Sequence, residues 1–331
     1  MTNFALMIIG PAGAGKSTLT TTLQMHAQSL HRTVHVVNLD PAADPEVRDD
    51  PIKPAIDIRD LISVEDVMEE MHLGPNGALI YCMEYLLANA DWLHDHLGNF
   101  DNDYLIFDCP GQIELYTHFP VIKNLVSLLN NWNYRTCALY VLDSQFLADT
   151  PKFFSGVLSA MSAMIQLEVP HINVLTKLDL LPSRANLSST TTSTTLSPDM
   201  GPIRVDSSAN PKAHIPHEED DDPYVHLNEF LFPDPTLLAS SANSQTHPRF
   251  HALNSALVRL IDEYNMVSFL PLNIKDERTI RNLFYQADLC LQWDEDQEPM
   301  EPRDIDRDDN DDDEPDLLEG GRDGVTEEYG F

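Results

Sequence analysis

The segment that most constrains this chain lies at its start, where an apolar stretch gives way to a glycine-rich one. Residues 4–9 read Phe-Ala-Leu-Met-Ile-Ile, and Gly10, Gly15, Lys16 and Ser17 then fill the pattern G-x-x-x-x-G-K-[ST]. Leucines at helical spacing follow directly. The sequence therefore predicts a strand, a phosphate-binding loop and a helix start, in that order.

Each residue type in this loop has a chemical reason to be there. Glycines let successive backbone N–H groups turn toward phosphates, and the N-terminus of the following helix adds about half a positive charge. Lys16 is expected to reach the β- and γ-phosphates, Ser17 to give its hydroxyl to Mg²⁺, and Thr18 to lie near the α-phosphate. The predicted nucleotide contacts are Gly13, Ala14, Gly15, Lys16, Ser17 and Thr18. The loop alone does not separate ATP from GTP, or a kinase from a switch.

A second buried strand is predicted from Val34 to Leu39, and it ends in Asp40 and Pro41. Ligands of an open parallel sheet lie beyond the carboxyl ends of its strands, which makes Asp40 a catalytic candidate for holding the Mg²⁺ shell or the attacking water. An aspartate before proline is also ordinary in turns and helix caps. Both interpretations stay open at this stage.

A third strand, Tyr104 to Phe107, runs into Asp108, with Gly111 and Gln112 following in the order D-C-P-G-Q. In P-loop NTPases such a strand end supplies a carboxylate for the Mg²⁺ shell and a backbone N–H near the γ-phosphate. Asp108 and Ser17 are therefore the predicted metal residues. By analogy, Gln112 is predicted to orient the attacking water.

A later strand ends in Thr176, Lys177, Leu178 and Asp179, which fit the base-recognition pattern [NT]-K-x-D. Its carboxylate can accept hydrogen bonds from guanine N1–H and the 2-amino group, which adenine does not offer, while the lysine stem covers the ring. After the earlier motifs, this order favours GTP over ATP. The strand end at 269–272 falls where the base pocket would be completed.

The alternation of strands and helices predicts an α/β fold, and composition divides the chain further. Residues 183–249 contain polar low-complexity runs, and residues 294–331 contain 18 acidic residues against three arginines, or −15 of the chain's net charge of −34. We expect a globular domain from 1–182 and 250–293. We expect a disordered insertion at 183–249 and a disordered acidic tail at 294–331.

The segment before the third strand predicts two features of its own. Gly74, Pro75, Asn76 and Gly77 have the composition of a tight turn. A long amphipathic helix is then expected from Ala78 to Leu97, because apolar side chains recur along one face. The turn by itself carries no functional signal.

Charge and cysteine usage restrict the partners and the compartment. A net charge of −34 repels nucleic acid and anionic membranes, so direct binding to either is not expected. The four cysteines are widely spaced, no apolar run reaches the length of a membrane span, and no secretory leader is evident. We therefore expect a soluble protein in a reducing, intracellular compartment.

Taken in order, the P-loop, Gly74-Pro75-Asn76, the D-C-P-G-Q segment and T-K-L-D resemble the GPN-loop GTPases. The stretches 143–146, Asp-Ser-Gln-Phe, and 269–271, Phe-Leu-Pro, look most like the third eukaryotic branch of that family. The resemblance implies a P-loop NTPase fold with a mostly parallel sheet, helices on both faces and the dimeric organisation of SIMIBI-like GTPases. It covers about residues 1–182 and 250–293.

The resemblance also implies properties that spacing does not show. Family members are dimers in which the Gly-Pro-Asn loop of one subunit reaches the other's active site, so Gly74, Pro75 and Asn76 would lie at the interface and Asn76 would be catalytic in trans. The third branch is expected to pair with the first and to serve assembly and nuclear import of RNA polymerases II and III. A cytoplasmic location, with shuttling to the nucleus, follows from that role.

Two other functions are compatible with a P-loop. One is a nucleotide or polynucleotide kinase, which would need a lid with clustered arginines, and no such cluster stands in the sequence. The other is a scaffold that binds nucleotide for stability alone, with the acidic tail as its interaction module. Turnover and acceptor phosphorylation would separate these from a GTPase that acts as a switch.

Overall fold

The structure is a computed structural model that describes residues 3–43, 53–100, 103–148, 150–180, 231, 243–244, 246–263 and 267–293. The predicted tail at 294–331 is outside the described residues. So is the predicted insertion at 183–249, apart from Leu231 and the short pieces after residue 242. Leu231 is buried in the core of the globular part.

The centre of the fold is a seven-stranded sheet with the order β3-β2-β4-β1-β5-β6-β7. Every pairing between these strands is parallel, so the predicted mostly parallel sheet is confirmed. All carboxyl ends therefore lie at one edge, where open α/β sheets bind ligands. The strands are β1 Asn3–Ile9, β2 Val34–Asn38, β3 Ile56–Asp57, β4 Tyr104–Asp108, β5 Tyr134–Asp143, β6 His171–Thr176 and β7 Phe269–Pro271.

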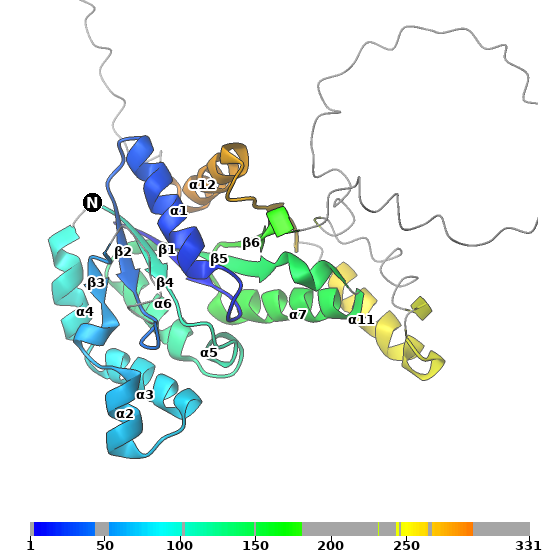
Figure 1. The fold of residues 1–331 in the computed structure, drawn as a ribbon, viewed down its shortest axis with the longest axis horizontal. Helices are drawn as coiled ribbons and strands as arrows, with labels where there is room; N and C mark the ends of the chain where they lie inside the picture. The colour runs from blue at the N-terminus through cyan, green and yellow to red at the C-terminus, as the bar shows by residue number, and fades with distance from the viewer. Residues whose placement is uncertain are drawn as a thin grey trace, which may run out of the picture. The chain divides into compact units, whose positions relative to one another are not determined.

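Helices cover both faces of the sheet, as Figure 1 shows. Alternate residues of β1 point to opposite faces: Leu6 and Ile8 pack with α1 (Lys16–Ser29) and α12 (Glu277–Leu291), and Met7 and Ile9 pack in the other core. The helices that contribute to this second core are α3 Pro75–Ala88, α4 Ala90–Leu97, α5 Glu114–Thr117, α6 Val121–Asn131, α7 Thr150–Leu167 and α11 His251–Glu263. Strands buried on both faces explain the continuous apolar runs in the sequence.

The Gly-Pro-Asn segment begins a helix and is not the tight turn that its composition predicts. Gly74 is the N-cap of α3, and Pro75 occupies the first helical position, where its missing N–H costs no hydrogen bond. The preceding helix α2, Val64–Met71, is capped by the Ser63 hydroxyl, which accepts from the Asp66 N–H. Val64 and Val67 of α2 pack against α3.

The single helix predicted from Ala78 to Leu97 is wrong, because the chain breaks at Asn89. The Asn89 amide donates to the Tyr85 carbonyl at 2.8 Å and ends α3, and the Asn89 carbonyl accepts from the Trp92 N–H in the first turn of α4. Side-chain bonding of this kind competes with helix continuation. β5 begins at Tyr134, before the apolar run that starts at Cys137, because its first residues pair with β1.

Candidate active site

Residues from five strand ends meet at the carboxyl edge of the sheet. Gly10 follows β1, and Asp40 follows β2 by two residues. Asp108 ends β4, in register with Ile8 of the neighbouring β1, and Asp143 of β5 pairs with Thr176 of β6. The fold thus gathers residues that are up to 166 positions apart in the sequence at one edge.

The glycines of the P-loop are needed for their backbone geometry. Gly10, Gly13 and Gly15 have positive φ angles of 139°, 76° and 93°. A Cβ on Gly10 would lie 2.3 Å from the Val141 carbonyl oxygen, which is too close for any side chain. Gly15 caps α1 without a side-chain hydrogen bond to the first turn. The N-terminus of α1 is therefore set up to bind an anion.

Lys16 lies almost wholly inside the site. It is 8% exposed, and its ammonium donates to the Pro11 carbonyl at 3.2 Å. Burial lowers the pKa of Lys16, while the nearby Asp108 and Asp40 carboxylates oppose that shift. An anionic ligand at this position would offset the cost of burying the ammonium charge.

The D-C-P-G-Q segment lies against the P-loop. A Cβ on Gly111 would stand 2.8 Å from the Ala12 Cα and 3.0 Å from the Lys16 ammonium nitrogen. The Oε1 atom of Gln112 is shielded from solvent and has no hydrogen-bond partner in the described part of the chain. Gln112 therefore has an acceptor oxygen that needs a donor, such as a water molecule.

Asp40 lies in a turn, which is one of the two interpretations that its position before Pro41 allows. Its Oδ1 accepts from the Ala42 N–H at 3.0 Å, and its own N–H donates to the Asn38 side chain. The buried Asn38 amide also donates to Asp57 of β3 at 2.9 Å. This second contact was not predicted, because β3 has only two residues and gives no periodic signal.

Arg59 completes this network at the end of β2. Its guanidinium makes a bidentate pair with Asp57 and donates to the Ala43 carbonyl at 2.8 Å. These hydrogen bonds lower the pKa of Asp57, although burial of its carboxyl acts in the opposite direction. The network fixes the chain after Asp40, so its role is to support the site.

The T-K-L-D segment is tied directly to the P-loop. The Thr176 hydroxyl lies 2.7 Å from the Ala14 carbonyl and 3.1 Å from that of Leu142. The Lys177 ammonium donates to the Gly13 carbonyl at 2.6 Å and to Asp143 at 2.7 Å. The single hydroxyl proton of Thr176 is therefore shared between two carbonyls, one in the P-loop and one in β5.

A cavity of about 180 Å³ opens beside these contacts. The predicted residues Gly15, Thr18 and Asp179 line it, together with side chains from the segment after β7, whose position in the chain predicts a part in the base pocket. The lining residues are Gly15, Thr18, Leu19, Thr176, Lys177, Asp179, Leu180, Leu272 and Ile274. Leu178, also a predicted nucleotide contact, is buried in the core and does not line the cavity.

The donors needed for Mg²⁺ are present, although no cluster of three or more metal-binding side chains occurs in the described residues. Asp108 is 1% exposed at the end of β4, and Ser17 is the second residue of α1. Both offer hard oxygen atoms. Mg²⁺ commonly takes one or two protein oxygens and completes its shell with phosphates and waters. The residues therefore fit a metal that arrives with a nucleotide.

The Gly-Pro-Asn segment does not join these residues within the chain. Gly74, Pro75 and Asn76 are all exposed at the start of α3. In the described residues no hydrogen bond or ion pair links Asn76 to the P-loop. Large apolar side chains of α2, of the segment after it and of α3 are also exposed, namely Met68, Met71, Leu73 and Tyr85. This surface has the features of one that a partner covers.

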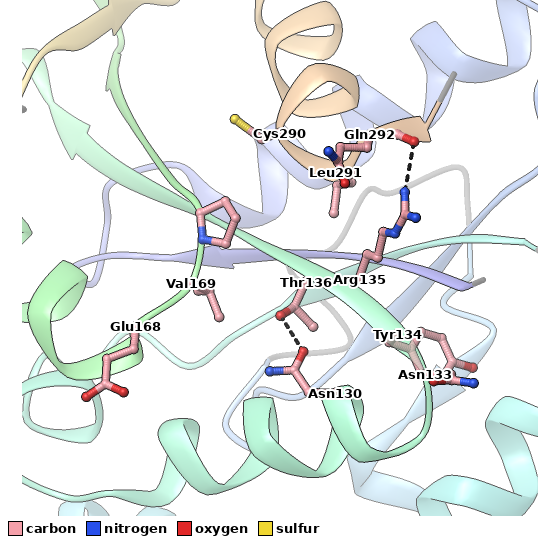
Figure 2. A pocket seen from close by; sticks show the side chains of 11 residues that line it. Asn130, Asn133, Tyr134, Arg135, Thr136, Glu168, Val169, Cys290, Leu291 and Gln292 are labelled. Carbon is pink, nitrogen blue, oxygen red and sulfur yellow. Dashed lines mark hydrogen bonds between the residues drawn. The ribbon is translucent and has the colours of Figure 1, made fainter. Parts of the chain in front are cut away.

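A larger cavity, of about 530 Å³, lies at the opposite edge of the sheet. Figure 2 shows Arg135 donating to the Gln292 carbonyl and Thr136 donating to Asn130 within it. Cys290 and Glu168 also line it. None of the predicted site residues does.

Comparisons with known proteins place this arrangement in a wider group. A family model described as "Conserved hypothetical ATP binding protein" matches residues 8–208. "GPN-loop GTPase 3" of Mycosarcoma maydis is 49% identical over 93% of the chain and 99% of its own length. Proteins of the same name from Schizosaccharomyces pombe and Saccharomyces cerevisiae are each 45% identical, over 95% and 92% of the chain and 100% and 98% of their own lengths.

A solved structure supports the fold independently. A GTPase from Pyrococcus abyssi, crystallised in the apo form, aligns with a TM-score of 0.63 over 87% of this chain and 97% of its own. Its sequence identity is 20%, so the likeness concerns the fold. The doubly covered α/β sheet is therefore shared well beyond the range of sequence similarity.

Proposed function

The chain belongs to the GPN-loop GTPase family, and from that premise we propose that it binds GTP at the carboxyl edge of its sheet and hydrolyses it. The comparisons differ on the identity of the base, because the matching family model is described as ATP-binding while the relatives are named GTPases. The observation that carries the choice of guanine is Asp179 in the cavity beside Lys177. A carboxylate accepts from guanine N1–H and the 2-amino group, and adenine lacks both donors.

The phosphates would lie along the P-loop. Backbone N–H groups of residues 13–18 at the start of α1 bind the α- and β-phosphates, and the buried Lys16 ammonium binds the β- and γ-phosphates. Ser17 and Asp108 would hold Mg²⁺, which neutralises phosphate charge when bound. The closeness of Gly111 to Lys16 supports a backbone contact with the γ-phosphate.

Hydrolysis needs a water in line with the bond that breaks. Gln112 has an unsatisfied, shielded Oε1 next to Gly111, so it is the residue we assign to hold that water. Asp40 is a second candidate from the end of β2, although one of its oxygens already accepts from Ala42. Gln112 therefore takes the main role and Asp40 an accessory one.

The active site is proposed to be completed by a second subunit. Asn76 is exposed, with no link to its own P-loop in the described residues, and a side-chain amide can stabilise developing charge on a transferring phosphoryl group. Exposed Met68, Met71 and Leu73 nearby supply an apolar surface for a dimer. The proposed mate is a paralogous GPN-loop GTPase of the first branch.

The proposed cellular role is assembly and nuclear import of RNA polymerases II and III, with the protein in the cytoplasm and shuttling to the nucleus. The high identity to relatives named GPN-loop GTPase 3 supports it. A net charge of −34 favours basic protein surfaces over nucleic acid as direct partners. Among the described helices, none is long and apolar enough to cross a membrane.

Binding and turnover assays test this function. GTP should displace a fluorescent guanine nucleotide far better than ATP, and hydrolysis should rise when the paralogous mate is added. An Asn76→Ala variant, mixed with a wild-type mate, should bind its own GTP normally and slow hydrolysis in the mate's site. ATP-dependent phosphorylation of a nucleoside or polynucleotide acceptor, without GTP turnover, would overturn the proposal in favour of a kinase.

A pull-down tests the cellular role separately. The intact protein, loaded with GTP or with GDP, should retain a GPN-loop paralogue and polymerase subunits to different extents. Recovery of neither under both nucleotides would contradict the proposed partners while leaving the nucleotide chemistry standing.

A further inference from the structure

The segment that follows β7 forms one wall of the 180 Å³ cavity. Leu272 and Ile274 line it, and Lys275 extends from the same segment to Asp179, with 2.9 Å between the ammonium nitrogen and Oδ2. The Lys275 side chain is 72% exposed, whereas that of Asp179 is 14% exposed. A solvated cation thus contacts the sheltered carboxylate to which base recognition is assigned.

The backbone that carries Lys275 is well fixed. The Leu272 N–H donates to the Leu175 carbonyl at 2.9 Å, which anchors the segment to the end of β6. The Lys275 N–H donates to the Asn273 side chain at 2.9 Å, and the Thr279 hydroxyl lies 2.9 Å from the Asn273 carbonyl. These hydrogen bonds fix the backbone at Lys275, and from this position the side chain can contact Asp179.

We propose that Lys275 is a positioning residue for guanine selection, which holds the Asp179 carboxylate in the orientation that accepts both donors of the base. This inference rests on the proposed function. The ion pair does not need to break when guanine binds, because a carboxylate has about four acceptor sites and the lysine occupies one oxygen. If Lys275 leaves acceptor sites of Asp179 available, it favours guanine binding. If it blocked those sites, it would compete with the base.

The size of the effect follows from the exposure of Lys275. Ion pairs that involve a solvated lysine contribute little, so its loss should weaken GTP binding about two- to fivefold. The effect must depend on the base, because inosine triphosphate lacks the 2-amino group and gives Asp179 only one hydrogen bond. A general attraction between Lys275 and the triphosphate would instead weaken both nucleotides equally.

A double-mutant cycle in the full-length protein tests the inference. Dissociation constants for GTP and ITP are measured for the wild type, Lys275→Ala, Asp179→Ala and the double variant. We expect the Lys275→Ala loss to be larger for GTP than for ITP and to vanish in the Asp179→Ala background. Lys275→Arg should restore most of the GTP affinity.

The matched control is Arg281→Ala, which removes an equally exposed cation from α12, where Arg281 pairs with Glu277. It should leave both dissociation constants unchanged. Equal losses for GTP and ITP, a loss that persists without Asp179, or tighter GTP binding by Lys275→Ala would each overturn the positioning role. A wild type that binds GTP and ATP equally would instead contradict the proposed function itself, so the two failures are distinguishable.

Discussion

The two edges of the sheet each hold a cavity, and the larger one lacks the features of a nucleotide site. The cavity at the carboxyl edge measures about 180 Å³ and the one at the opposite edge about 530 Å³. Gly15 lines the smaller cavity, and the same edge of the sheet carries two more glycines with positive φ, a buried lysine and a buried aspartate. In the larger, Arg135 donates to the Gln292 carbonyl and Thr136 donates to Asn130 (Figure 2). The volume of a cavity therefore indicates function less well here than its position relative to the carboxyl ends of the strands.

The physical cause of this difference is the parallel arrangement. Helix α1 begins at the carboxyl edge, so its positive N-terminus points at the smaller cavity. Helices α6, α7 and α12 end beside the larger one, which Asn130, Glu168 and Leu291 line. The negative ends of these helices repel anions, and Arg135 satisfies a carbonyl after α12. These features support the carboxyl edge, and not the opposite one, as the proposed triphosphate site.

The sharpest test of this contrast is a pair of single substitutions. Lys16→Ala removes the buried ammonium from the carboxyl edge and should weaken GTP binding at least about 100-fold, since charge-assisted contacts to two phosphates are lost. Arg135→Ala removes a cation from the other edge and should leave the dissociation constant unchanged. Isothermal titration with GTP measures both, and comparable losses in the two variants would remove the distinction between the edges.

A smaller effect on GTP binding is expected when the phosphate contacts remain and only the residue that positions the attacking water is lost. Gln112→Leu should lower single-turnover hydrolysis about 100-fold, because a positioned polar group is missing in the transition state. Its GTP affinity should remain within about twofold of the wild type. If affinity and hydrolysis fell together, Gln112 would have a structural role and the assignment would be wrong.

The least effect on nucleotide binding is expected from a change near the opposite edge, at His171, the first residue of β6. Burial lowers the pKa of His171 to about 4, although the nearby Asn173 side chain acts in the opposite direction. Between pH 6.5 and 4 the unfolded chain therefore binds more protons than the folded one, and stability falls as pH falls. From pH 7.5 to 5 this group accounts for about 2 kcal/mol of the free energy of unfolding.

His171→Phe should remove that part of the pH dependence and leave GTP affinity at pH 7.5 unchanged. Urea unfolding of both proteins at pH 7.5 and 5 measures the difference, and parallel losses of stability would show that His171 does not titrate as described.

The sequence predicts most of the carboxyl edge because its signals are local. Each motif follows an apolar strand, so the pattern of residues alone assigns Lys16, Asp108 and Asp179 to the carboxyl edge of the predicted sheet. Sequence reasoning missed contacts that depend on chain segments far apart. Lys275 meets Asp179 across 96 positions, and no spacing rule connects them.

Helix boundaries failed where polar side chains compete with the backbone. The periodicity of residues 78–97 is helical throughout, yet Asn89 bonds to the preceding turn and divides the segment. Gly74 and Pro75 show the reverse case, in which residues typical of turns begin a helix because proline fits its first position. Such choices depend on what each end packs against, which composition does not report.

An Asp179→Asn variant tests the proposed recognition of guanine by Asp179 at the carboxyl edge. Xanthine has a carbonyl in place of the guanine 2-amino group, so an amide donor at this position matches xanthine and a carboxylate matches guanine. Dissociation constants for GTP and XTP should show that the wild type prefers GTP and that the variant prefers XTP. An unchanged preference in the variant would show that Asp179 does not recognise the base.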